Sequence, residues 1–368
     1  MSRLEELIAE HCPDGVEHKK LGDVCEIGTG RGNRQDAVDD GEYPFYVRSA
    51  EPLKSDTYLY DEEAIIVPGE GRVGEIYHYI VGKYNLHQRA YRIAGKDETI
   101  NLKFVLYYMK SHFKKFILMR AVTGTVLSIR KPMLTDFQIP VPPIDVQHEI
   151  VRILDTFTEL TQELTQEREL REKQYNYYRD TLLTFGDDVE VKKLGDICEI
   201  VRGERVTKGQ LAVDGEYPVV SGGTGYMGYF DTFNREGENI TIAQYGSAGT
   251  IMWHDYKFWA NDVCYTVIPK DDTLNKRYLY YVIMSKENAI SSMVNRNAFP
   301  YSLSRDSLNL LTIPIPPIEV QNEIVAILDR FNTLANDIDH GLPKEIELRT
   351  KQYEYYRDQL LTFKEVTA

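Results

Sequence analysis

Apolar residues recur at helical spacing in two long stretches of the chain, residues 139–185 and 313–363. In the first stretch the steps alternate between three and four, as in a coiled coil, at Ile150, Ile153, Phe157, Leu160 and Leu164. After a stutter, which predicts local unwinding of the supercoil at Glu167 to Arg171, the pattern resumes at Tyr175, Tyr178, Leu182 and Phe185. The second stretch has the same pattern at Ile324, Ile327, Phe331, Leu334 and Ile338, then at Tyr353, Tyr356, Leu360 and Phe363. We therefore expect two long amphipathic helices.

Prolines mark where these helices begin. The segments IPVPP and IPIPP stop a preceding strand or helix and suit a first helical turn, so the helices are predicted to begin near Ile144 and Ile318. The second helix contains His340-Gly341-Leu342-Pro343 between its apolar runs, which predicts a break or kink there. A helix of roughly 40 residues, about 60 Å long, needs a partner for its apolar face. The nearest partner is the other helix, in antiparallel orientation.

The stretches before the two helices read as short strands bounded by Gly, Asp and Asn. Examples are EYPFYVR, EAIIVPG and EIYHYIVG. Helical spacing then predicts a helix over 102–119 and another over 274–294. The patterns together predict an α+β protein in which two strand-rich α/β domains alternate with two long helices.

The chain is an internal duplication. KLGDVCEI at 20–27 returns as KLGDICEI at 193–200, and DGEYP at 40–44 returns at 214–218. A repeat of about half the chain is too long for a solenoid. We expect a pseudo-twofold, nearly circular arrangement, because the N-terminal segment takes the place before the first domain that the end of the central helix takes before the second. The predicted boundaries are 1–19 for the N-terminal helical segment, 20–138 and 187–312 for the domains, and 139–186 and 313–368 for the long helices.

Charge is distributed unevenly along the 368 residues. The formal net charge is −14, but residues 136–192 hold 13 acidic against 6 basic side chains, whereas residues 20–135 hold 15 against 17. The acidity therefore lies mostly in the helices and does not exclude DNA binding by the domains. With no apolar run of roughly 18–20 residues and no signal peptide, a cytoplasmic protein is expected. The four scattered cysteines are expected to be reduced core residues.

The sequence contains no recognisable catalytic motif. There is no glycine-rich phosphate loop and no Asn/Asp-Pro-Pro-Tyr/Phe motif of amino-methyltransferases. His148 begins HEIVR, which lacks the second histidine of a zinc-binding HExxH motif, so we expect it on a solvated helix face. No catalytic residue, metal or cofactor is predicted for this chain.

Candidate binding residues lie at matching positions in the two repeats. The turns in GEGRVG and YGSAG keep their glycines and differ in the projecting residues, as two readers of different DNA sequences would. Ordinary hairpin turns with drifted surface residues are an equally good interpretation. Two matched basic loops and two Ser-cation pairs suit DNA phosphates, although solvated loops and a turn cap would look the same. The candidate DNA-binding residues are Arg31, Arg34, Glu70, Arg72, Ser128, Arg130, Lys131, Arg202, Arg205, Lys208, Gln244, Tyr245, Ser247, Trp253, Ser302 and Arg305.

The whole pattern resembles the specificity subunits of type I restriction-modification systems. The resemblance is carried by KLGDVCEI and KLGDICEI, by IPVPPIDVQHEIVRILDTF and IPIPPIEVQNEIVAILDRF, and by KQYNYYRDTLLTF and KQYEYYRDQLLTF. It covers almost the whole chain. It implies two target-recognition domains, each reading one half of a bipartite double-stranded DNA site, held apart by an antiparallel helical pair.

The resemblance also implies partners and a non-catalytic role. Two adenine-N6 methyltransferase subunits would bind along the helices, and restriction (translocase-nuclease) subunits would join the full complex. S-adenosylmethionine, ATP and magnesium would belong to those partners. Two other functions stay open: a structural coiled-coil adaptor that binds proteins through its duplicated domains, and an enzyme with an unrecognised site.

Overall fold

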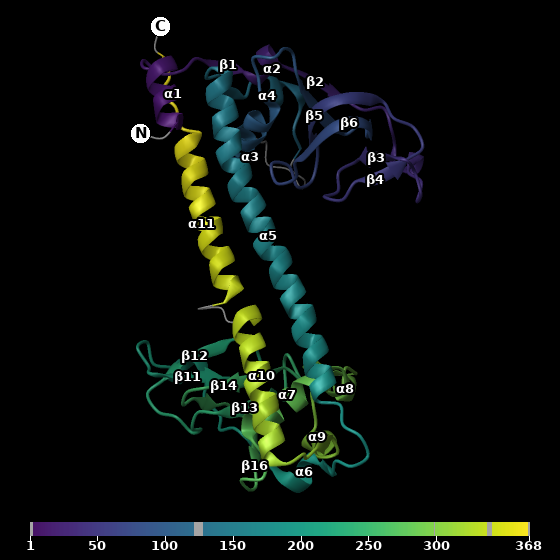
Figure 1. Cartoon of the computed structure of the whole chain (residues 1–368), viewed down its shortest axis with the longest axis vertical. Coiled ribbons are helices and arrows are strands. Elements are labelled where there is room, and N and C mark those ends of the chain that lie inside the picture. The colour runs from purple at the N-terminus through teal and green to yellow at the C-terminus, as the bar shows by residue number, and fades with distance from the viewer. Residues whose placement is uncertain (1–2, 121–127, 298, 337–340, 367–368) are drawn as a thin grey trace. The chain divides into compact units, whose positions relative to one another are not determined.

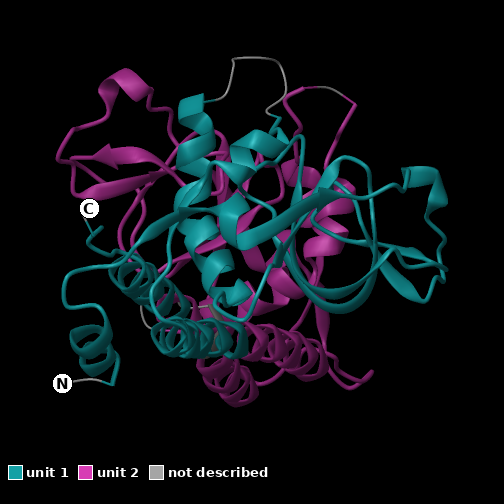
Figure 2. Ribbon diagram, turned by 90° about the horizontal axis from the view of Figure 1, so that it is seen from above, with its two compact units in different colours: residues 1–164, 346–368 teal, residues 165–345 magenta. Residues whose placement is uncertain are grey.

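The computed structural model describes residues 3–120, 128–297, 299–336 and 341–366 (Figure 1). They form two units, unit 1 with residues 1–164 and 346–368, and unit 2 with residues 165–345 (Figure 2). One long helix, α5 (Ile144–Leu182), begins in unit 1 and ends in unit 2. The domain boundaries drawn from the sequence stay predictions.

Unit 1 is built around a six-stranded sheet. The strands lie in the order β2-β7-β5-β6-β3-β4, with β3 parallel to β6 and the other neighbours antiparallel. The helix α3 (Leu102–Arg120), predicted for 102–119, covers the sheet because Val105 and Phe113 pack against Ile65 and Ile93. The strands are β2 (Cys25–Thr29), β3 (Tyr43–Tyr46), β4 (Leu53–Ser55), β5 (Tyr60–Pro68), β6 (His78–Leu86) and β7 (Ala90–Gly95).

Unit 2 repeats this topology with one break. Where β6 is a single strand, unit 2 has two, β14 (Ile251–His254) and β15 (Trp259–Ala260), so the sheet divides into β10-β16-β13-β14 and β12-β11-β15. The register identifies equivalent positions, since Ile65 pairs with Tyr79 as Ile240 pairs with Trp253. The other strands are β10 (Cys198–Arg202), β11 (Tyr217–Val220), β12 (Tyr226–Phe230), β13 (Asn239–Ala243) and β16 (Cys264–Pro269).

The single helix predicted over 274–294 is wrong. The structure has α7 (Lys276–Ser285) and α8 (Glu287–Met293), separated by Lys286, whose φ of −103° and ψ of 16° are not helical. The bend accompanies burial of Ile290 in the core of unit 2. Apolar spacing continues across the bend, which is why the sequence pattern did not reveal it.

Short elements also occur in matched pairs. The two-stranded ladders β1 (His18–Lys20) with β8 (Gln138–Pro140), and β9 (Val191–Lys193) with β17 (Thr312–Pro314), precede the long helices. The remaining short elements are α2 (Leu21–Val24), the 3₁₀ helices η1 (Arg34–Asp36) and η2 (Lys208–Gln210), α4 (Lys131–Thr135), α6 (Leu194–Ile197) and α9 (Arg305–Asn309).

The chain ends meet in unit 1. The helix α1 (Arg3–His11) contributes Leu4 to a cluster that contains Leu361. Beyond it, the amide of Val16 donates to the carbonyl of Lys364 over 2.8 Å, and that of Val366 donates to the carbonyl of Val16 over 3.1 Å. The N-terminal segment therefore lies beside the end of the second long helix, and the expected circular arrangement is confirmed in unit 1.

The long helices begin where the prolines predicted. Ile144 begins α5, and Ile318 begins α10 (Ile318–Asn336). The second long helix is interrupted, as predicted, because Gly341 lies outside both α10 and α11 (Leu342–Leu360). The stutter in α5 does not interrupt the helix.

Each unit contains a crossed contact between the two long helices. In unit 1, Phe157 of α5 stacks on Tyr356 of α11 with 5.4 Å between ring centroids. In unit 2, Tyr178 of α5 stacks on Phe331 of α10 at 5.1 Å. Phe157 and Phe331 are equivalent in the repeats, as are Tyr178 and Tyr356, so each helix pairs with the opposite end of its copy. This is the antiparallel pairing that the sequence predicted.

The apolar seam does more than join the helices. Ile150 and Ile324 are buried in clusters shared with α3 and α7, and the fully buried Leu154 and Leu328, which the heptad pattern missed, lie in the same clusters. Ile338 and the side chain of Leu334 lie outside the described part of the chain. The other predicted pairing residues are partly or well exposed, namely Ile153, Leu160, Leu164, Leu182, Ile327 and Leu360.

Candidate nucleic-acid interface

The two glycine turns have the same backbone. In unit 1, Gly71 and Gly74 have φ of 89° and 75°; in unit 2, Gly246 and Gly249 have 76° and 90°. These left-handed conformations favour glycine, which explains why the glycines persist while the residues between them differ. Both turns follow a buried strand, β5 or β13, and project from the end of its sheet.

A second predicted segment lies against each turn. Glu70 forms an antiparallel bridge with Ser128, and Tyr245 forms the equivalent bridge with Ser302. The segment continues into a short helix that begins with a basic residue, Lys131 in α4 or Arg305 in α9. The structure therefore brings two of the three matched sets of candidate residues together, in both units.

The turn of unit 1 carries arginines that the sequence analysis missed. The carboxylate of Glu70 lies 3.0 Å from Arg48 and 2.9 Å from Arg89. The hydrogen bond from Arg89 is the main cause that lowers the pKa of Glu70, and Arg48 adds to it. Since both arginines are about half exposed, the cluster presents positive charge held in place by Glu70. Glu70 is thus occupied by arginines and is not a free acceptor for a base, and only the fold shows that residues 48, 70 and 89 converge.

Lysines of α3 extend this surface. The carboxylate of Glu75 binds Lys114 at 2.7 Å and Arg72 at 3.1 Å, and the hydrogen bond from Lys114 is the main cause that lowers its pKa. Arg72 is 68% exposed, so its guanidinium can still reach a ligand. Beside them, a cavity of about 520 Å³ is lined by Gly74, Lys110, Ser111, Lys114, Lys115, Leu118 and Met119.

The turn of unit 2 presents tyrosines instead. Tyr245 and Lys208 line one cavity of about 470 Å³ together with Gly222 and Tyr226. The hydroxyl of Tyr226 is hydrogen-bonded to Tyr256, and Tyr229 packs edge-on against Tyr226. Tyr226, Tyr229 and Tyr256 are 39%, 47% and 50% exposed, respectively. A cluster of exposed tyrosine rings and hydroxyls can hydrogen-bond base edges and phosphates.

The basic loops are exposed in both units. Arg202 donates from Nε to the carbonyl of Asp262 over 2.6 Å and shares a cavity of about 450 Å³ with Arg305 and Lys270. This places the second basic loop beside the start of α9. The exposed residues of these loops and of the segments that precede the long helices are Arg31, Arg34, Ser128, Arg130, Lys131, Arg202, Arg205, Lys208 and Arg305; Ser247 is exposed on its turn.

Two candidate residues lie away from this surface. The Oε1 atom of Gln244 is buried and has no hydrogen-bond partner among the described residues, so it does not project toward a groove. Trp253 lies with its ring against Arg277, 4.7 Å from centroid to guanidinium, and its Nε1 donates to Asp255. Its counterpart by register is Tyr79, which faces Lys103. Trp253 therefore belongs to the contact between domain and long helix, not to the glycine turn.

Within the described ranges, no group of three or more His, Cys, Asp and Glu side chains could hold a metal ion. In the same part of the chain, no helix combines the length and apolar character required to cross a membrane. All four cysteines are buried and free, as predicted, and His148 is exposed on α5.

Each unit therefore combines a strand-rich domain, an exposed glycine turn and parts of the long helices. Residues 13–172 and 186–348 each match the family described as Type I restriction modification DNA specificity domain. The chain therefore belongs to this family and contains two such domains.

Relatives of known name agree with this. A Haemophilus influenzae protein named as a type I restriction enzyme specificity subunit is 32% identical, over 95% of this chain and 96% of its own length. An Escherichia coli type I restriction enzyme specificity subunit is 37% identical over 61% of this chain and 63% of its own. The crystal structure of a type I restriction-modification S subunit from M. genitalium shares the fold, with a TM-score of 0.71, 18% identity, and coverage of 94% and 96% of the two chains.

Proposed function

We propose that this chain is the non-catalytic recognition subunit of a DNA-modifying complex, and that each unit reads one half of a bipartite DNA target. The observation that carries the proposal is the shared backbone of the two turns with different side chains on them. Glu70 with its two arginines in unit 1 stands where Tyr245 stands in unit 2. A common scaffold with different donors and acceptors suits the reading of two different base sequences in the major groove.

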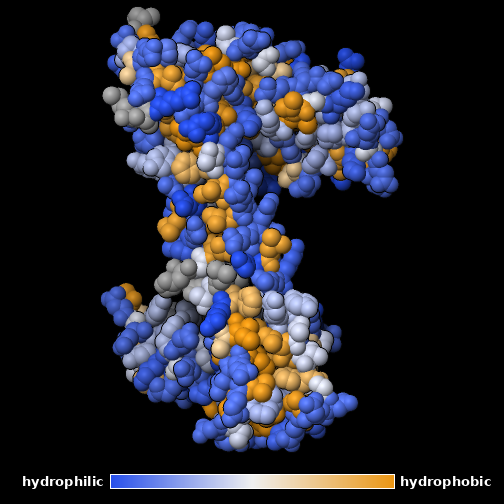
Figure 3. Space-filling view, viewed as in Figure 1, coloured by the Kyte–Doolittle hydropathy of each residue, from blue (hydrophilic) through white to orange (hydrophobic). Residues whose placement is uncertain are grey.

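The catalytic partners would be adenine-N6 methyltransferase subunits, two per chain. Apolar (orange) side chains reach the surface along the helical part of the chain (Figure 3). An exposed pair of leucine and tyrosine occurs twice on the long helices: Leu170 and Tyr177 on α5 are 64% and 67% exposed, and Leu348 and Tyr355 on α11 are 53% and 62% exposed. Residues seven apart lie on one helix face, so each pair forms a stripe. Two equivalent stripes suit two copies of one partner, since exposed apolar patches commonly mark protein interfaces.

The remaining components would bind to those partners. Restriction subunits would join the complex, and S-adenosylmethionine, ATP and magnesium would be held outside this chain. The methyltransferase copies would flip out the target adenine of each half-site, because an adenine inside the duplex is not accessible to them. This chain would supply the position, and its partners the chemistry.

The test is to map methylated adenines across a genome with and without this gene, together with a methyltransferase partner. Methylation confined to one bipartite sequence, and lost with the gene, is the expected result. Methylation or cleavage by the purified chain alone would show that it is an enzyme. Failure of the chain with its partner to bind any duplex would instead favour a protein-binding adaptor.

The number of partners has its own test. Replacing Leu170 and Tyr177 by Glu should reduce the complex from two methyltransferases per chain to one, and the matched pair Leu348→Glu and Tyr355→Glu should do the same. Native mass spectrometry reports the stoichiometry. Two bound partners in both double variants would contradict the assignment of the stripes.

A further inference from the structure

Gln147 joins the long helix α5 to the domain of unit 1. Its side chain is completely buried. The Oε1 atom accepts from the amide of Asn101 over 2.9 Å, just before α3 begins. The Nε2 group donates to the carbonyl of Thr99 over 2.9 Å and to that of Pro142 over 2.7 Å. One side chain thus binds the start of α3 and the proline segment before α5.

Gln321 makes the same three bonds in unit 2. Its side chain is also completely buried. Oε1 accepts from the amide of Asn275 over 2.8 Å, and Nε2 donates to the carbonyls of Thr273 and Pro316 over 3.0 and 2.8 Å. The same bonds form in two units whose glycine turns carry different side chains, so their geometry does not depend on which side chains the turn presents.

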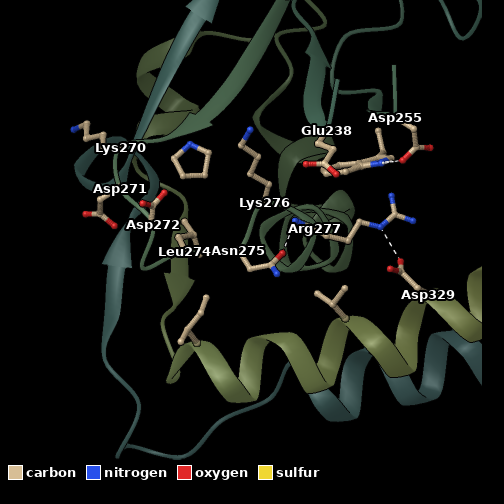
Figure 4. A pocket seen from close by; sticks show the side chains of 14 residues that line it. Glu238, Asp255, Lys270, Asp271, Asp272, Leu274, Asn275, Lys276, Arg277 and Asp329 are labelled. Carbon is tan, nitrogen blue, oxygen red and sulfur yellow. Dashed lines mark hydrogen bonds and ion pairs between the residues drawn. The ribbon is translucent and has the colours of Figure 1, made fainter. Parts of the chain in front are cut away.

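A second contact lies eight residues further along each long helix. In unit 1, the carboxylate of Asp155 accepts from Tyr107 over 2.6 Å and from Lys103 over 2.7 Å, both on α3. In unit 2, Asp329 accepts from Arg277 over 2.7 Å and also from Tyr281, both on α7. Figure 4 shows Arg277 extending from α7 to Asp329 on α10, on the wall of a cavity of about 600 Å³.

We propose that Gln147 with Asp155, and Gln321 with Asp329, are positioning residues that fix the orientation of each recognition domain on its helix and so set the spacing between the half-sites. This inference rests on the proposed function. Two contact points about 12 Å apart, at 1.5 Å per residue, define a direction as well as a position. We call each pair of contacts a joint.

The polar character of the joints supports this role. Leu154 and Leu328 already supply apolar contact between helix and domain, but apolar packing tolerates small shifts of one surface on another. A buried amide that must satisfy both its donors and its acceptor allows only one arrangement, because a shifted one leaves polar groups unpaired. The joint therefore favours one angle where apolar packing alone would permit several.

The experiment uses the full chain in complex with its methyltransferase partner. Gln147→Glu keeps the shape and the acceptor for Asn101 but places a second oxygen against the carbonyls of Thr99 and Pro142. Methylation rates are measured on duplexes with fixed half-sites and a spacer lengthened or shortened by one or two base pairs. We expect the preference of the wild-type complex for its own spacer to fall by about tenfold, with unchanged half-site sequences. Gln321→Glu should have the same effect.

Two further variants separate positioning from stability. Asp155→Asn removes the ion pair with Lys103 at a site that is 26% exposed, so it reports on the joint even where Gln147→Glu fails to fold. Ile65→Val reduces packing in the sheet of unit 1 away from the joint and should lower the melting temperature without changing the spacer preference.

Joint variants that lower the melting temperature but keep the wild-type spacer preference would overturn the inference. A wild-type complex indifferent to spacer length would instead contradict the bipartite function itself. The two failures are therefore distinguishable.

Discussion

The two glycine turns show how one scaffold presents different chemistry. In unit 1 the turn is surrounded by charge: Glu70 holds Arg48 and Arg89, and Arg72 and Lys114 share Glu75. In unit 2 the equivalent surface is formed by Tyr245, Tyr226 and their aromatic neighbours, with Lys208 at one side. Nothing in the backbone of the turns requires this difference.

The joints show the opposite behaviour. The hydrogen bonds of Gln147 and Gln321 agree within 0.1 Å, bond for bond. Divergence is therefore concentrated where DNA would be read, and constancy where the domain is fixed to the helix. The side chains on the turns have thus changed between the units without any change in the contacts that fix each domain to its helix.

The largest effect is expected from lengthening α5. Unit 1 ends at Leu164 and unit 2 begins at Thr165 within this helix, so helical residues inserted near Glu167 add about 1.5 Å each between the units. The original target should lose methylation, and a target with the same half-sites and another spacer should gain it. Methylation mapping of the insertion variant is the measurement. An unchanged spacer with altered half-sites would refute the separation of frame and readers.

The lysines of unit 1 should give the next largest effect. Lys110, Lys114 and Lys115 have no charged counterparts in unit 2, where the repeat places Met284, Asn288 and Ala289. Replacing all three by Gln should reduce the slope of log K against log salt by up to about three, roughly 0.9 per lost phosphate contact. Fluorescence anisotropy across a salt series measures this slope. Lys83→Gln, in the same unit, is the matched control on another exposed strand.

Single arginines of unit 1 should affect one half-site only. Arg72→Ala is expected to relax specificity at the first half-site by about 1–3 kcal/mol, the discrimination that one good base contact provides. Arg48→Ala and Arg89→Ala should act in the same direction. Methylation of target libraries randomised at each half-site distinguishes them. Equal loss at both half-sites would indicate a phosphate contact or a folding role.

Tyrosine hydroxyls of unit 2 should give a smaller effect at the other half-site. Tyr245→Phe keeps the ring and removes one hydroxyl, so a loss of about 1 kcal/mol at the second half-site is expected. Tyr226→Phe should be comparable. The same randomised libraries serve as the assay, with Tyr58→Phe, at a tyrosine of unit 1 that is 46% exposed, as the control. A change at the first half-site would show that the units are not independent readers.

The smallest effect concerns stability near neutral pH. Burial lowers the pKa of His254 in unit 2 to about 4. Its Nε2 atom lies in a hydrogen bond of 2.8 Å with the hydroxyl of Thr241. The equivalent position in unit 1, by strand register, is Ile80, which does not titrate. The unfolded chain takes up a proton on this ring below about pH 6.5, but the folded chain does so only near pH 4. The free energy of unfolding should therefore decrease as the pH is lowered from about 7 toward 4, by about 0.7 kcal/mol between pH 7 and pH 6.

Urea unfolding at the two pH values, with His254→Gln as the comparison, measures this loss. The variant should show a smaller decrease than wild type, because glutamine does not titrate. Equal decreases in both proteins would exclude His254 as the cause.

The long helices and their pairing could be predicted from the sequence, because the residues that determine them act locally or occur in both repeats. Proline fixes its own backbone, so the starts of α5 and α10 were predicted at Ile144 and Ile318. The apolar face of each long helix predicted that the two helices pair, and the stacking of Phe157 on Tyr356 confirms it. The bend at Lys286 was missed because apolar periodicity does not register a change of helix direction.

Only part of the candidate DNA-binding surface could be predicted from the sequence. Matching of the repeats identified the two glycine turns and the two Ser-cation segments as separate candidates, and only the structure pairs Glu70 with Ser128 and Tyr245 with Ser302. Arg48 and Arg89 carry no such signal, because strand pairing brings them to Glu70 from distant parts of the chain. Trp253 was proposed as a base or groove contact, but in the structure its ring packs against Arg277 of α7.

By itself the sequence determined the duplication, the two long helices, their antiparallel pairing and the family. Only the tertiary structure decided which side chains surround each turn. It alone also shows that Gln147 and Gln321 are buried between the long helix and the domain, and are not surface residues of an amphipathic helix. The physical reason is the distance along the sequence over which each kind of interaction acts. Periodicity, proline and glycine act on the backbone within a few residues, whereas the hydrogen bond from Gln147 to Thr99 joins residues that are 48 positions apart in the sequence.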